Sequence, residues 1–133
     1  MSKFPMMIEN NRVAGFIANK VSLDALLSAL TNAGYDGDGM ILVHHGDEGL
    51  HNIDPEGIYH GGRVRFLRSV QKFVSGADEK ILNNVEKALK QGKYAVSVLT
   101  DGSDAQRIEA GQLFKANGAE EVFYKGSGII EFL

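Results

Sequence analysis

Residues 93–126, KYAVSVLTDGSDAQRIEAGQLFKANGAEEVFYKG, read as a strand, a helix and a second strand. The apolar run Tyr94–Leu99 is typical of a buried strand. Ser103 and Gln106 have the spacing of a capping box, in which two side chains satisfy backbone N–H groups at a helix start. Val122–Tyr124 then predicts a short closing strand. The stretch therefore predicts a β-α-β unit.

Residues 12–46 repeat this order near the start of the chain. Val13–Ala18 (VAGFIA) is an apolar run, Ser22 is a good N-cap residue, and Met40–Val43 (MILV) predicts the second strand. One helical stripe between them consists of leucines: Leu23, Leu26, Leu27 and Leu30. The separation from the first strand residue to the predicted cap is nine residues in both units.

Two β-α-β units of this length predict an α+β fold, specifically a ferredoxin-like split βαβ plait with an antiparallel sheet and both helices on one face. The first strand of each unit would be central, because it is the most continuously apolar, and the second strand would be an edge. The chain would be one domain, 1–133. Its parts would be the first unit (12–46), an insertion (47–92), and the second unit with an apolar tail (93–133).

The insertion at 47–92 predicts a loop followed by two helices. The first helix would start at Arg63 and carry a stripe of four apolar residues: Val64, Leu67, Val70 and Val74. The second would begin at Asp78 and end at Gly92. This hairpin would either cover an open sheet face or make a contact between subunits.

The C-terminus, GSGIIEFL, is too apolar for a frayed tail. We expect Ile129, Ile130, Phe132 and Leu133 to dock on their own domain or on a partner. A fifth strand through Ile129–Ile130 is the alternative.

All four histidines lie in one glycine-dense segment that is acidic and contains no lysine or arginine: His44, His45, His51 and His60. Imidazole and carboxylate ligands suit zinc, iron, nickel or manganese. The spacing of the four histidines matches no established metal motif, and His44 and His45 would point to opposite faces of a strand. A divalent metal is therefore one candidate cofactor, and a small metal-dependent enzyme using residues 44–60 is one alternative function. A solvated loop is the other interpretation.

A second candidate site is the start of the first inserted helix, at Gly61, Gly62, Arg63 and Arg65. Backbone N–H groups at a helix start attract anions, and arginine binds phosphate or carboxylate bidentately. These residues predict a small anionic ligand, although neither GxxxxGK[ST] nor GxGxxG occurs. A solvated basic helix face is the simpler alternative. RNA contact through the basic helix 63–72 is a weaker one, because no aromatic stacking pair accompanies it.

Composition and sequence patterns narrow the classes of function that remain. The formal net charge is −3, which argues against a nucleic-acid partner, and the absence of cysteine excludes disulfides and thiol catalysis. No apolar stretch approaches the roughly 20 residues of a membrane span, so we expect no membrane partner and a cytoplasmic location. No nucleophile motif is present. We therefore predict a binding protein with an accessory or regulatory role, without catalysis, that forms a homodimer.

Two quoted stretches resemble one known family. VSLDALLSALTNAGYDGDGMILVHHGDEG (21–49) is similar to the N-terminal domain of bacterial general-stress (heat-induced stress) proteins. GKYAVSVLTDGSDAQRIEAGQLFKANGAEEVFYKGSG (92–128) is similar to the closing half of that domain. The resemblance implies the plait and a stress-related context. It implies no activity or catalytic residue. Many relatives carry a long Gly/Ala-rich insertion where this chain has the charged segment 63–91.

Overall fold

The computed structural model describes residues 11–37, 40–44, 64–67, 83–84, 87–88, 90–126 and 129–133, with 64–67 described by their backbone. Within these residues the helices and strands with defined bounds are β1 (Arg12–Ile17), α1 (Lys20–Asn32), β2 (Ile41–His44), β3 (Val64–Leu67), β4 (Tyr94–Leu99), α3 (Asp104–Ala116), β5 (Glu120–Gly126) and β6 (Ile129–Phe132). Residues 83–84, 87–88 and 90 are also helical, which agrees with the second predicted helix of the insertion.

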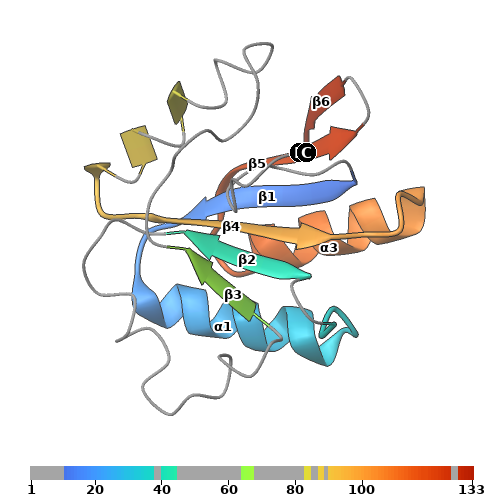
Figure 1. Ribbon diagram of the computed structural model, residues 1–133, viewed down its shortest axis with the longest axis horizontal. Coiled ribbons are helices and arrows are strands. Elements are labelled where there is room, and N and C mark those ends of the chain that lie inside the picture. Colours follow the sequence, from blue (N-terminus) through green and yellow to red (C-terminus); the bar gives the residue numbers. More distant parts are fainter. Residues whose placement is uncertain are drawn as a thin grey trace.

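The six strands form one sheet in the order β3-β2-β4-β1-β5-β6 (Figure 1). Neighbouring strands from β2 to β6 are antiparallel, whereas β3 runs parallel to β2. The class is therefore α+β, as predicted, with β1 and β4 at the centre. No described helix is long and apolar enough to cross a bilayer.

Three predictions about the sheet are wrong. The second strand of each unit is not an edge, because β3 lies outside β2 and β6 lies outside β5. The sheet is not wholly antiparallel, and its six-strand order differs from a four-stranded plait. Val64–Leu67 is a strand and not the start of a basic helix. A four-residue run of Val, Arg, Phe and Leu fits a helical stripe and a strand equally well, and pairing with β2 decides between them.

The start of α1 also differs from the prediction. Asn19 is the N-cap, and its Oδ1 accepts a hydrogen bond from the backbone N–H of Ser22 at 2.9 Å. Asparagine and serine are equally good caps, so composition could not choose between them. Gly34 and Gly118, both with positive φ, follow the ends of α1 and α3.

Both helices pack on the same face of the sheet and form the main core with it (Figure 1). Helix α1 contributes the four leucines of the predicted stripe: Leu23, Leu26, Leu27 and Leu30. Helix α3 contributes Ala110 and Phe114. One close approach is at Gly15 in β1, where a Cβ atom would lie 3.1 Å from Phe114 Cδ2. The missing side chain at Gly15 is thus what lets α3 reach the central strand.

The opposite face of the sheet is buried as well. Ala14, Phe16 and Phe123 alternate with residues of the main core, and all three are buried. Polar residues share this face with them, among them Arg12 and Ser97. The central strands are therefore buried on both faces of the sheet.

Candidate functional site

The histidine segment enters the described residues only at its first member. His44 is the last residue of β2, pairs in register with Ala95, and is 1% exposed. It is thus part of the sheet interior and not of a solvated loop. His45, His51 and His60 lie outside the described residues, so the structure does not test whether the four histidines converge. Within the described ranges, no group of three His, Asp or Glu side chains could hold a metal ion.

The structure also describes only one of the four residues of the predicted anion site. Gly61, Gly62 and Arg63 lie outside the described residues, and Arg65 lies in β3, paired in register with Leu42 of β2. Because 64–67 is extended, the arginine does not lie in a first helical turn. Arg65 therefore does not have the helix-start geometry that was predicted for it. Anion binding by the four residues and RNA contact through 63–72 stay predictions.

Sequence reasoning missed a buried cation at the start of β1. Arg12 is 2% exposed, and its Nη1 donates to the carbonyl oxygen of Met40 at 3.0 Å and to Ser97 Oγ at 3.1 Å. The guanidinium thus joins β1 to β4 and to the residue that precedes β2. A charge is costly to bury unless it is hydrogen-bonded, so this arginine is committed to the fold. The signal in the sequence was a charged residue directly preceding the apolar run.

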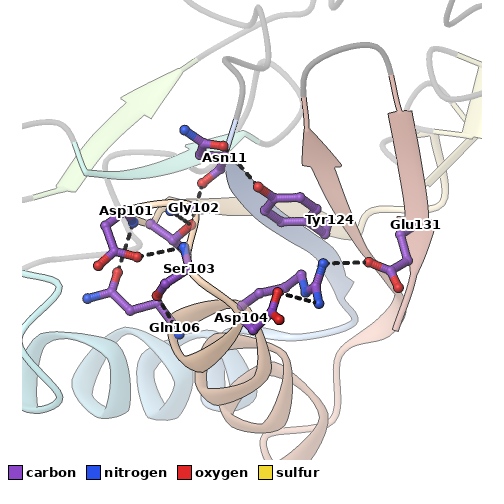
Figure 2. Close-up of polar contacts among 10 residues, drawn as sticks. Asn11, Asp101, Gly102, Ser103, Asp104, Gln106, Tyr124 and Glu131 are labelled. Atoms are coloured by element: carbon purple, nitrogen blue, oxygen red, sulfur yellow. Dashed lines mark hydrogen bonds and ion pairs between the residues drawn. The ribbon is translucent and has the colours of Figure 1, made fainter.

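A polar cluster surrounds the turn from β4 into α3, residues 100–103, and Figure 2 shows it. Thr100 Oγ1 and Thr100 N–H both donate to the carbonyl oxygen of Asn11 at 2.8 Å. Gly102 has φ +85°, and a Cβ there would lie 3.1 Å from Asn11 Oδ1. A glycine is therefore needed at this position for both its conformation and its space. Tyr124 Oη also donates to Asn11 Oδ1, at 2.9 Å.

The predicted capping box is present in a modified form. Ser103 Oγ accepts from the Gln106 N–H at 3.2 Å, as predicted. The glutamine, however, reaches past the cap, and its Oε1 accepts from the Asp101 N–H at 2.9 Å. Asp101 Oδ1 takes over the remaining donor, the Ser103 N–H, at 2.8 Å. Hydrogen bonds from the Ser103 side chain and backbone lower the pKa of Asp101.

Arg107 connects this cluster to the C-terminal strand. Its guanidinium contacts Asp104 Oδ1 at 2.9 Å and Glu131 Oε1 at 3.1 Å (Figure 2). It also lies over the Tyr124 ring, 5.4 Å from the ring centre, within cation–π range. The three acceptors come from α3, β5 and β6. The cluster therefore links these three elements, and its polar groups bind one another.

An open polar depression of about 320 Å³ lies at the other end of β4. Its described lining is mostly amide and charged side chains: Asn84, Lys87, Ala88, Gln91, Lys93 and Glu121. Lys93 Nζ is already 2.6 Å from Glu120 Oε1, and Glu121 has a positive φ of 53° at the bulge in β5. The depression is at the sheet end where β2 finishes at His44. Its chemistry suits a small polar molecule.

The third feature is the edge strand β6. It closes the sheet order, and Ile129 and Phe132 are 56% and 55% exposed. The Phe132 ring tilts against Phe123 with a centroid distance of 6.1 Å. The C-terminal tail thus docks on its own domain, as predicted, and it does so as a strand paired with β5. Even in this docked strand, the side chains of Ile129 and Phe132 stay exposed to solvent.

The chain was compared with known proteins. It matches no protein-family model, no curated protein and no solved structure.

Proposed function

We propose that the protein is an accessory or regulatory binding protein that acts as a homodimer and carries out no catalysis of its own. The observation that supports this most directly is β6, an edge strand that exposes Ile129 and Phe132. An apolar edge strand offers unpaired backbone groups and apolar side chains to another chain, and soluble proteins usually protect such edges.

The polar clusters favour binding over catalysis. Asp101 and Asp104 serve the start of α3, and Glu131 is bound to Arg107. The lowered pKa of Asp101 keeps its carboxyl group ionised well below neutral pH. Such a group accepts the hydrogen bond from the Ser103 N–H but is a poor proton donor or acceptor near neutral pH.

The fold and context form part of the same proposal. The strands of the two β-α-β units occupy the order β2-β4-β1-β5 with both helices on one face, and we interpret them as a ferredoxin-like plait extended by β3 and β6. The resemblance of residues 21–49 and 92–128 to bacterial general-stress proteins supports a stress-related role in the cytoplasm.

Sedimentation equilibrium tests the homodimer. One chain has a mass of 14.4 kDa, so we expect a species of about 29 kDa. The exposed edge is short, and its interface would be smaller than the roughly 800 Å² per partner of a standard complex. Association should therefore depend on concentration, and the measurement should span roughly 10 to 500 μM, the range that reports micromolar affinities. A mass of one chain over that whole range contradicts the proposal.

A further inference from the structure

The backbone of β6 is already oriented for a partner. The Leu133 N–H donates to the carbonyl oxygen of Val122 at 2.9 Å. In an antiparallel pair the bonded residues alternate, so the backbone N–H and C=O groups of Leu133, Glu131 and Ile129 face β5. The Asn11 N–H donates to the carbonyl oxygen of Lys125, which fixes the same alternation from the β1 side. The N–H and C=O groups of Ile130 and Phe132 therefore point away from β5.

The side chains of β6 carry little that would prevent pairing. Lysine, proline and bulges are common protections of an edge strand, and Ile129–Phe132 contains neither lysine nor proline. Its one charge, Glu131, is held by Arg107 at 3.1 Å. The opposite edge strand, β3, carries Arg65 in its middle and pairs in parallel with its neighbour. Of the two edges of the sheet that the described strands form, β6 is thus the better template.

We propose that β6 pairs with β6 of a second copy of this chain, antiparallel about a two-fold axis, so that one sheet continues across both subunits. This assignment rests on the proposed homodimer and names its surface. The axis lies between the two copies of Glu131. Ile130 then faces Phe132 of the other copy through the outward hydrogen-bonding groups, and Ile129 faces Leu133.

The two-fold axis and the alternation of faces leave few registers, because directly opposed residues must lie on the same face. An axis at Ile130 would place Ile129 opposite the carboxylate of Glu131. An axis at Phe132 would place Glu131 opposite Leu133 and would pair Ile130 with no residue of β6. The axis at Glu131 gives four apolar pairs, and its one like-charged pair is compensated by two arginines.

This central pair gives the interface an electrostatic signature. Like charges directly opposed across strands are unfavourable, and each Arg107 offsets one of the two carboxylates. We therefore expect Glu131→Gln to tighten the dimer and Arg107→Gln to weaken it. An Arg107–Glu131 ion pair that did no more than hold β6 on its own subunit would predict no tightening of the dimer from Glu131→Gln.

Proline substitution separates pairing with β5 from pairing with a second copy. Ile130→Pro removes an N–H that points outward, and proline is tolerated at such positions of an edge strand. We expect Ile130→Pro to sediment as one chain at concentrations where the unchanged protein forms a dimer. The control is Val21→Lys, which removes an 80% exposed apolar side chain from α1 and should leave the dimer intact. Far-UV circular dichroism of both variants checks that each is folded.

The cysteine-free chain allows the register to be read by crosslinking. At a non-hydrogen-bonded pair the Cα atoms are about 4.5 Å apart, within the range of a disulfide. Glu131→Cys should therefore form a covalent dimer on mild oxidation. Ile130→Cys or Phe132→Cys should not, because neither residue faces its own copy.

The outcomes separate the two proposals. A single-chain mass for the unchanged protein overturns the homodimer and this assignment with it. A dimer that survives Ile130→Pro leaves the homodimer standing and overturns the β6 interface. Crosslinking of Ile130→Cys in place of Glu131→Cys overturns the register. The unchanged protein could instead sediment as one chain and bind a different protein, with Ile130→Pro abolishing that binding. This result would assign the edge to the other protein and overturn the self-pairing.

Discussion

Replacing Gly15 with alanine tests whether the contact between β1 and α3 is as tight as the structure indicates. The new Cβ would lie 3.1 Å from Phe114 Cδ2, 3.3 Å from Ala119 Cβ and 3.3 Å from Val122 Cγ2. Carbon atoms are optimally about 3.5–4.0 Å apart, and Phe114 is fully buried, so it has nowhere to move. Overpacking of this kind costs about 1–3 kcal/mol. Alanine also restricts the unfolded chain more than glycine does, and this offsets about 0.4–1 kcal/mol of the overpacking cost.

We therefore expect Gly15→Ala to lower the free energy of unfolding by about 1.5 kcal/mol. With a urea dependence of about 2 kcal/mol/M, the midpoint would fall by about 0.7 M. The matched control is Gly111→Ala, where the atom nearest to the new Cβ is Leu133 Cδ1 at 2.9 Å, the far end of a flexible side chain. That variant should be neutral or more stable, because alanine gains about 1 kcal/mol in a helix. An unchanged or higher midpoint for Gly15→Ala would refute the packing argument.

Three further predictions concern the polar contacts, and each is read by urea unfolding. Tyr35 Oη donates to Glu109 Oε1 at 2.6 Å, so Tyr35→Phe should cost about 1–2 kcal/mol. Burial and Glu109 raise the pKa of Tyr35, so its contribution is full below pH 10 and is lost as the pH rises further; Tyr35→Phe should not share that loss. Ser103→Ala removes the oxygen that caps α3 and should cost about 1 kcal/mol, whereas Ser103→Asp should largely restore it. A double-mutant cycle of Arg107→Gln and Glu131→Gln should give a coupling of about 0.5 kcal/mol that shrinks in high salt; a coupling insensitive to salt would show that packing dominates.

Features set by local chemistry were predictable from the sequence. Ser103 caps α3, the leucine stripe of α1 faces the core, and glycines follow both helices, because each depends on neighbours within a few residues. The central position of β1 and β4 was also predictable, since strands covered on both faces are apolar on both faces.

Features set by distant partners were not predictable. Val64–Leu67 is extended because β2 offers it a parallel ladder, and nothing within those four residues signals that ladder. The buried state of Arg12 depends on Ser97, which is 85 residues away in the chain. The histidine and glycine-arginine segments suggested sites by composition. Only His44 and Arg65 are placed, both in strands, so the other positions stay predictions.

The proposed interface does not have to order itself when a partner arrives, because α3 already holds β6 in place. Arg107 contacts Glu131, and one helical turn later a Cβ atom on Gly111 would lie 2.9 Å from Leu133 Cδ1. Four helical residues advance about 6.0 Å and two strand residues about 6.8 Å, so helix and strand stay in step over this distance. Ordering a free tail would cost roughly 1–2 kcal/mol per residue, a cost that a five-residue edge could not recover on binding. Because α3 and β5 have already met that cost within one subunit, even a short edge can pair with a second copy.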